Sequence, residues 1–176
     1  MNKKYVWYVA YGSNMLKERF MVYINGGPFR GLRHPYEGCT DKSPPLMDKP
    51  FLIPYKFYFG NESKTWNGKG VAFIDVKKPG VTLGRAYLIT EEQLLDIKNQ
   101  EGPSESWYGN VVEIPTGVVG DIPHKLLTSQ SRRSANTPAN EYLDIIFEGI
   151  CETYPQLACF QTIFENYYSR HNVNRI

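Results

Sequence analysis

The sequence predicts an α+β fold, in which a single domain is built on a curled sheet or barrel with flanking helices. Segments rich in β-branched and aromatic residues come first and helical segments come mostly later, without regular strand–helix alternation. The 176 residues suit one domain with a full core, and no repeat or linker divides residues 1–176. Hydrophobic residues make up 41% and charged residues 22%, which excludes a globally disordered chain.

The first third of the chain predicts a strand, a turn, a helix and a long loop. Residues 5–11 are almost all aromatic or β-branched, as in a buried strand, and Gly12, Ser13 and Asn14 then form a tight turn. A helix is expected over 15–24, with glycines and a proline ending it. Residues 29–50 hold four prolines and little periodicity, which indicates a long surface loop.

The middle of the chain predicts strands joined by polar turns. Strands are expected over 51–59, 70–76 and 81–89, with turns at 60–69 and 77–80. Thr90 is placed to cap a helix that has an apolar face and ends at Glu101, because Gly102 and Pro103 follow. For the rest of the chain we expect strands over 107–114 and, more weakly, 118–127, then a polar loop over 129–136. Two helices are expected to follow, over 138–153 and 156–171.

Charge and cysteine content narrow the possible partners and compartment. The 20 basic and 18 acidic residues give a net charge of +2, so nucleic acid is not an expected partner. No run approaches the roughly 20 apolar residues of a membrane span, so no membrane partner is expected. Three cysteines, an odd number without paired spacing, fit a reducing compartment and predict a cytoplasmic protein.

No motif for a metal or an organic cofactor is present in the sequence. His34, His124 and His171 are scattered, without the spacing of a zinc site. The glycine patterns that bind nucleotide phosphates and the GxSxG turn of serine hydrolases are also missing. We therefore expect no metal site and no cofactor.

Two elements could carry chemistry, and each has a simpler alternative. The turn from Tyr11 to Asn14 could direct backbone N–H groups at a carboxylate or an oxyanion, or Asn14 could merely cap the following helix. Glu101 could turn inward and act as a general base, because partial burial raises a carboxyl pKa, or it could be a solvated residue at a frayed helix end.

Two further elements leave their interpretation open. Trp66 and the two glycines at 68 and 70 could form a wall of a ligand pocket or an ordinary hairpin. Tyr142, just inside a helix that begins near Pro138, could pack in the core or offer its hydroxyl to a ligand.

Taken in order, these segments resemble the gamma-glutamylcyclotransferase family. The stretch Tyr8–Met15 resembles the family's signature loop, 59–72 its segment of asparagine, tryptophan and paired glycines, and 84–102 the stretch that ends in its catalytic glutamate. Residues 138–152 resemble its C-terminal helix signature. Met15 stands where leucine is common, Ala139 stands where serine is frequent, and 29–50 is longer than in many relatives.

The resemblance implies a small mixed β-barrel with flanking helices and a reaction without a cofactor. The α-amine of a γ-glutamyl compound attacks its own γ-carbonyl, releasing 5-oxoproline and the free amine or amino acid. Glu101 is the implied general base. The implied substrate-binding residues are Tyr8, Ala10, Tyr11, Gly12, Ser13, Asn14 and Tyr142.

The sequence leaves the substrate and the oligomeric state open. A γ-glutamyl-amine cyclotransferase, an enzyme that removes γ-glutamyl groups within one pathway, and a binding module without activity are the alternatives. The aromatic residues Phe160, Phe164, Tyr167 and Tyr168 either belong to the core or cover a contact between two copies, so a homodimer is possible.

Overall fold

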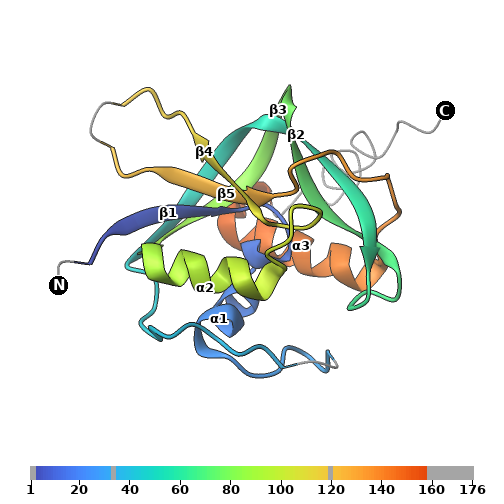
Figure 1. Cartoon of the computed structure of the whole chain (residues 1–176), viewed down its shortest axis with the longest axis horizontal. Coiled ribbons are helices and arrows are strands. Elements are labelled where there is room, and N and C mark those ends of the chain that lie inside the picture. The colour runs from blue at the N-terminus through green and yellow to red at the C-terminus, as the bar shows by residue number, and fades with distance from the viewer. Residues whose placement is uncertain (1–2, 33–34, 119–120, 158–176) are drawn as a thin grey trace.

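In the part of the chain that it describes, the structure combines one mixed sheet with three α-helices. The computed structural model describes residues 3–32, 35–118 and 121–157, and the statements that follow concern these residues. Beyond Leu157, the predicted helix 156–171 lies outside them. The elements in chain order are β1 (Tyr5–Ala10), η1 (Ser13–Met15), α1 (Lys17–Asn25), β2 (Met47–Ser63), β3 (Lys69–Thr90), α2 (Glu91–Glu101), β4 (Asn110–Ile114), β5 (His124–Thr128), α3 (Asn140–Thr153) and η2 (Pro155–Leu157) (Figure 1).

The sheet has the strand order β2-β3-β1-β5-β4, with the predicted first strand at its centre. β1 pairs antiparallel with β3 and parallel with β5, and all of its residues after Tyr5 are buried. Its run of aromatic and β-branched residues fits a strand that is covered on both faces. Residues 11–14 directly follow the end of β1, so they begin in the interior of the protein.

The predicted α+β class is confirmed, but the expected barrel is wrong, because the sheet of the described residues is open. Its edge strands are β2 and β4. The long β2–β3 hairpin has register shifts around Tyr55, which bend it (Figure 1). Its far half pairs with the segment after β5 in two isolated bridges, Gly60 with Ala135 and Gly70 with Pro138, and Asn136 adds side-chain hydrogen bonds to it. The segment after β5 thus lies along the far half of the hairpin without forming a regular ladder of hydrogen bonds with it.

Several predicted boundaries also needed correction. β2 begins at Met47, inside the predicted loop 29–50, and β3 runs without a break through 77–80, where a turn was expected. Pro79 is accommodated there because it pairs with Tyr55 at the register shifts, where a ladder donor is not needed. β4 and β5 are shorter than the strands expected at 107–114 and 118–127.

The two helices beside the site begin in different ways. At α2 the predicted Thr90 cap is confirmed, since its hydroxyl accepts from the Gln93 N–H and the Gln93 side chain returns a bond to the Thr90 N–H. α1 begins at Lys17, whose N–H donates to the Glu152 carboxylate of α3 at 2.9 Å. The prediction that Asn14 caps this helix is therefore wrong, and its side chain is available for another role.

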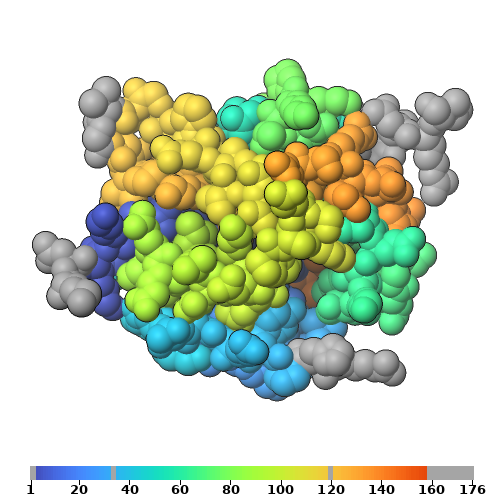
Figure 2. Space-filling model, in the orientation of Figure 1, coloured from blue at the N-terminus to red at the C-terminus, as the bar shows by residue number. Residues whose placement is uncertain are grey.

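The helices hold the end of β1 from several sides. α2 contacts β1, β3 and α1, while α3 contacts η1 and β3. In the core, the rings of Phe20 and Tyr87 stack with centroids 3.9 Å apart, joining α1 to β3. Figure 2 shows α2 and the chain that follows it, in yellow-green, covering one face of the molecule. No helix among the described residues has the length and apolar character needed to cross a membrane.

Candidate active site

The end of β1, the end of α2 and the start of α3 enclose a small inner cavity of about 40 Å³. Seven of the eight sequence-predicted site residues line it. The exception is Ala10, which is buried in β1 opposite Arg85 and precedes the loop. The lining residues are Tyr8, Tyr11, Gly12, Ser13, Asn14, Ala72, Glu101, Tyr108, Leu127 and Tyr142.

Glu101 is half-buried at the last position of α2 and points at the signature loop. Its Oε1 accepts a hydrogen bond of 2.5 Å from Nδ2 of Asn14. Burial raises the pKa of its carboxyl from 4.5 to about 7, and the positive charge of Arg19 and hydrogen bonding from Asn14 oppose this rise without cancelling it. Glu101 is thus not a solvated carboxylate at a frayed helix end.

The Asn14 side chain connects the loop to both Glu101 and Tyr8. Its Nδ2 lies 3.3 Å from the Tyr8 hydroxyl as well as within hydrogen-bond distance of the carboxylate. Its Oδ1 is buried and has no hydrogen-bond partner in the described structure. Because an unpaired buried acceptor costs stability, this oxygen is suited to receive an N–H donor from a ligand.

Tyr142 packs in the core, the first of its two sequence interpretations, and its hydroxyl also borders the inner cavity. It is buried, and its hydroxyl accepts a bond of 3.1 Å from the Ala72 N–H while lining the inner cavity. An ideal Cβ placed on Gly12 would lie only 2.9 Å from this hydroxyl oxygen and 3.1 Å from the Ala72 Cβ. Glycine is therefore required at position 12 for close approach of the loop to α3 and β3.

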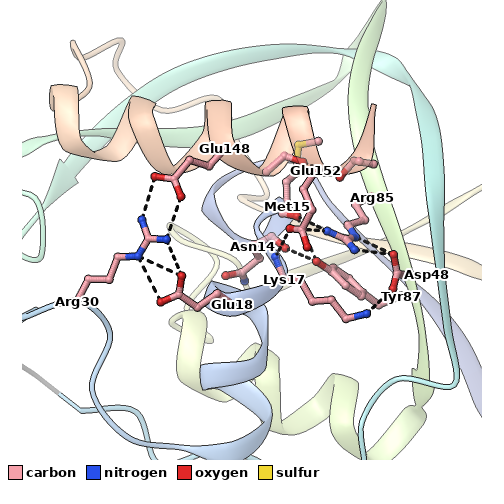
Figure 3. A network of polar contacts seen from close by, with 12 residues as sticks. Asn14, Met15, Lys17, Glu18, Arg30, Asp48, Arg85, Tyr87, Glu148 and Glu152 are labelled. Atoms are coloured by element: carbon pink, nitrogen blue, oxygen red, sulfur yellow. Dashed lines mark hydrogen bonds and ion pairs between the residues drawn. The ribbon is translucent and has the colours of Figure 1, made fainter. Parts of the chain in front are cut away.

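A polar network fixes the backbone immediately after the loop (Figure 3). Arg85 on β3 donates to the Met15 carbonyl at 3.1 Å and pairs with Asp48 at 2.6 Å and Glu152 at 2.9 Å. The Tyr87 hydroxyl donates a hydrogen bond of 3.0 Å to the carbonyl oxygen of Asn14. These contacts use carbonyl groups of η1, so they hold the backbone that follows Gly12 and Ser13 in place.

A second bridge joins the helices on either side of this network. Arg30 forms hydrogen bonds with Glu18 on α1 and with Glu148 on α3 (Figure 3). All three side chains are largely exposed, so the bridge contributes modestly to stability. It links α1 and α3 at the surface, while the Lys17–Glu152 contact links them nearer the loop.

An outer cavity of about 410 Å³ adjoins the inner one. The two share Ser13, Glu101, Tyr108 and Tyr142, so the Glu101 carboxylate lies where they meet. Trp66 lies in the turn between β2 and β3, so the predicted hairpin is confirmed, and its side chain lines this cavity; that the cavity binds a ligand stays a prediction. The remaining lining residues are Arg19, Tyr23, Tyr36, Glu62, Ser63, Lys64, Thr65, Val71, Gln100, Gly102 and Trp107.

Most of the outer cavity and part of the inner one were not predicted from the sequence. Tyr108 and Leu127 lie in segments expected only to be strands, so nothing marked them as lining residues. Arg19 left a usable signal, because it stands four residues before Tyr23 and so on the same side of the helix as an aromatic residue. A basic residue on an apolar helix face is unusual enough to single out.

The one histidine among the described residues, His124, lines neither cavity. His124 is fully buried between the rings of Trp7 and Phe51, and neither of its ring nitrogens has a hydrogen-bond partner in the described residues. His34 and His171 lie outside the described residues. Within the described residues, no three His, Cys, Asp or Glu side chains are grouped so that they could hold a metal ion.

Comparison with known sequences gives one partial match. Histone deacetylase 5 of Arabidopsis thaliana is 32% identical over 192 aligned positions. The match includes 84% of this chain but only 28% of that protein, so the chain spans little more than a quarter of its relative's length. No protein-family model matches the chain.

Solved structures give a more extensive likeness. A gamma-glutamyl cyclotransferase has a TM-score of 0.64 at 22% identity, covering 92% of this chain and 87% of its own. An uncharacterized protein from Homo sapiens has a TM-score of 0.64 at 24% identity, covering 93% and 88%. YkqA from Bacillus subtilis has a TM-score of 0.61 at 19% identity, covering 98% and 55%. The resemblance found in the sequence thus predicted the fold correctly, apart from the closed barrel, and the chain has the gamma-glutamyl cyclotransferase fold.

Proposed function

We propose that this protein is a γ-glutamylcyclotransferase, which converts a γ-glutamyl amino acid or amide into 5-oxoproline and the free amino acid or amine. One observation carries the proposal. A half-buried glutamate with a pKa of about 7 is hydrogen-bonded to the signature loop at the junction of a small inner cavity and a larger outer one. This arrangement suits a reaction that separates a small cyclic product from a leaving group of variable size.

Glu101 is the proposed general base. The substrate's α-amine must lose a proton when it attacks the γ-carbonyl, and an α-amino group has a pKa near 8. A carboxylate whose pKa is about 7 accepts this proton with little energetic penalty. The same carboxyl then returns the proton to the leaving nitrogen as the C–N bond breaks, so Glu101 ends the cycle ionised.

The loop is proposed to hold the glutamyl half of the substrate in the inner cavity. The unpaired Oδ1 of Asn14 is available to accept an N–H of the α-amine beside the base. The backbone N–H groups of Gly12 and Ser13 are the proposed donors to the oxyanion that develops on the γ-carbonyl. Tyr8, Tyr11 and Tyr142 form the remaining walls.

Positioning supplies much of the proposed rate enhancement. Nucleophile and electrophile belong to one molecule, so the enzyme must mainly hold the folded conformer in which the amine faces the carbonyl. Well-oriented intramolecular reactions gain roughly 7–11 kcal/mol in this way. A narrow cavity lined by tyrosine rings and a rigidly supported loop favours such a conformer.

The test is an assay for 5-oxoproline by mass spectrometry with γ-glutamyl amino acids, γ-glutamyl amines and glutathione as substrates. Glu101→Gln keeps the shape of the side chain but removes the base, and we expect it to lower turnover by roughly 10²–10⁴-fold. The matched control is Glu92→Gln, the same change at an exposed position of the same helix, which should leave turnover unaltered.

The outcomes separate the candidate functions. Turnover that depends on Glu101 supports a cyclotransferase, and the preferred substrate then distinguishes amino acids from amines as leaving groups. Undiminished turnover in a folded Glu101→Gln protein would remove this residue from the mechanism. If the folded wild-type protein converts none of these compounds, the cyclotransferase proposal fails and a binding role becomes the better account.

A further inference from the structure

Arg85 is a buried cation on β3 that contacts three other elements at once (Figure 3). It lines neither the inner nor the outer cavity. Its Nε and Nη2 donate to Oδ1 of Asp48 on β2, at 2.9 and 2.6 Å. Its Nη1 lies 3.1 Å from the Met15 carbonyl oxygen of η1 and 2.9 Å from Oε2 of Glu152 on α3. A guanidinium is planar and holds its donors in fixed directions, so Arg85 fixes these three partners relative to one another.

Two of these contacts enclose the short segment from Met15 to Lys17. Glu152 uses the same oxygen, Oε2, to bind Arg85 and to accept the Lys17 N–H, each at 2.9 Å. The contacts thus run from the Met15 carbonyl through Arg85 and Glu152 back to the backbone two residues later. The Lys17 ammonium adds a second ring, because it lies 3.0 Å from Oδ2 of Asp48. One ion pair therefore holds both a carbonyl and an N–H group of this segment.

The segment held in this way begins one residue after Asn14. The Asn14 carbonyl accepts the hydroxyl of Tyr87 at 3.0 Å, and its side-chain Nδ2 lies 2.5 Å from Oε1 of Glu101. Consecutive residues are joined by planar peptide units of fixed length, so a displacement of Met15 is passed on to Asn14. The contacts of Arg85 are thereby connected to the place of the Glu101 carboxylate.

We propose that Arg85 is a positioning residue of the reaction, which holds the Met15 backbone so that the Asn14 amide keeps the Glu101 carboxylate in its working place. The inference rests on the proposed function. Because Arg85 lines neither cavity, it acts through the backbone and through Asn14 rather than on the substrate. A misplacement of about 1 Å costs roughly 10²-fold in rate, so a residue away from the chemistry can control it.

Stability alone is a weak reason to bury a guanidinium at this place. Removing a charge from water costs free energy, and replacing a buried ion pair by apolar residues of similar volume is often neutral or stabilising. An apolar residue at position 85 would not supply a donor directed at the Met15 carbonyl. The set of contacts around Arg85 therefore specifies the geometry of the loop.

The pH at which kcat/KM rises reports on this geometry, because the hydrogen bond from Asn14 holds the pKa of Glu101 down. If Arg85→Met lets the loop move, that bond weakens and the rise moves to higher pH. Loss of a positive charge would act in the same direction. Asp48→Ala separates the two causes, since loss of a negative charge would move the rise to lower pH, whereas release of Arg85 would move it to higher pH.

The experiment measures kcat/KM for 5-oxoproline formation between pH 5 and 9 with the preferred γ-glutamyl substrate. We expect Arg85→Met to move the rise to higher pH by about one pH unit and to lower kcat roughly 10²-fold. Asp48→Ala and Arg85→Lys, which keeps the charge but not the planar set of donors, should move it in the same direction. In an Asn14→Ala protein, Arg85→Met should cause no further movement, because the bond through which it acts is already absent.

These variants retain the other charged and titratable groups that act on Glu101 or are affected by its charge, which are Arg19, Tyr8, Tyr11, Tyr23, Tyr108 and Tyr142. Arg30→Met is the matched control. Arg30 also joins α1 to α3, but its hydrogen bonds go to Glu18 and Glu148 rather than to η1, so the pH profile should stay the same.

Thermal unfolding establishes which variants are folded, and Asp48→Ala and Arg85→Lys carry the test if Arg85→Met is not. A rise that stays at the wild-type pH in the folded variants, or that moves to lower pH in Asp48→Ala, would overturn the inference and leave the cyclotransferase proposal standing. An undiminished effect of Arg85→Met in the Asn14→Ala protein would overturn it in the same way. If the wild-type protein converts no γ-glutamyl compound, the proposed function fails and this inference with it.

Discussion

The Asn14 amide nitrogen lies 2.5 Å from Oε1 of Glu101, although 87 residues separate the two in the chain. This contact joins the turn after the central strand to the last residue of α2. It also fixes the carboxylate at the junction of the two cavities, where burial holds its pKa near 7. The properties that make Glu101 suitable as a base therefore depend on the loop as much as on the helix.

The rate of the proposed reaction should depend on the ionisation of Glu101. Only the ionised carboxylate accepts a proton, so kcat/KM should rise with pH through a pKa of about 7. Asn14→Asp places a second negative charge beside the carboxylate and should move this rise to higher pH. The measurement is kcat/KM between pH 5 and 9 in both proteins. Superimposable profiles would show that another group controls the rise.

Replacing Glu101 should also change stability in a pH-dependent way. The folded pKa, about 7, is raised above the ordinary value of 4.5, so the contribution of this carboxyl to stability is fully present below pH 4.5 and is lost as pH rises through 7. Glu101→Gln avoids that loss. At pH 8 the variant should be more stable than the wild type by at most about 3 kcal/mol.

Urea unfolding at pH 4.5 and pH 8 measures this effect. The gain should be present at pH 8 and nearly absent at pH 4.5, and the exposed control Glu92→Gln should show no such difference. A gain of equal size at both values would mean that packing, rather than ionisation, separates glutamate from glutamine at this position.

Gly12→Val should abolish turnover while the protein still folds. The first added carbon would already lie 2.9 Å from the Tyr142 hydroxyl, so the loop or α3 must shift by several tenths of an ångström. A misplacement approaching 1 Å costs roughly 10²-fold or more in rate. Thermal unfolding establishes that the variant is folded, and the 5-oxoproline assay gives its turnover. Normal turnover would contradict the close packing described for the loop.

Gly149→Ala tests how α3 supports the same loop from its other side. An added Cβ would lie 2.4 Å from the Leu16 nitrogen and 2.6 Å from the Met15 carbonyl carbon, both backbone atoms that cannot rotate away. Such overpacking typically costs about 1–3 kcal/mol. We expect lower stability in chemical denaturation together with lower kcat/KM.

Asp144→Ala, at an exposed position of α3, is the control for introducing alanine into this helix. It should leave kcat/KM intact. If Gly149→Ala lowers stability but not kcat/KM, the packing of α3 on residues 15–16 stabilises the fold without positioning the loop.

Local patterns in the sequence determined the central strand, the capped helix α2 and most of the inner cavity. The aromatic and β-branched run of β1 and the Thr90–Gln93 capping box each involve only a few neighbouring residues. Both can therefore be recognised from a short window of the sequence. The order of the segments then identified seven of the inner cavity's lining residues.

Only the tertiary structure decided the state of Glu101, the contacts of Asn14 and the burial of Arg19 beside the outer cavity. Whether a carboxylate at a helix end is solvated or desolvated depends on what packs over it, and Asn14 arrives from a distant strand. The bend of the long β2–β3 hairpin likewise depends on register shifts, which local propensity does not encode. Burial and pairing are properties of residues brought together by folding, so no window of the sequence contains them.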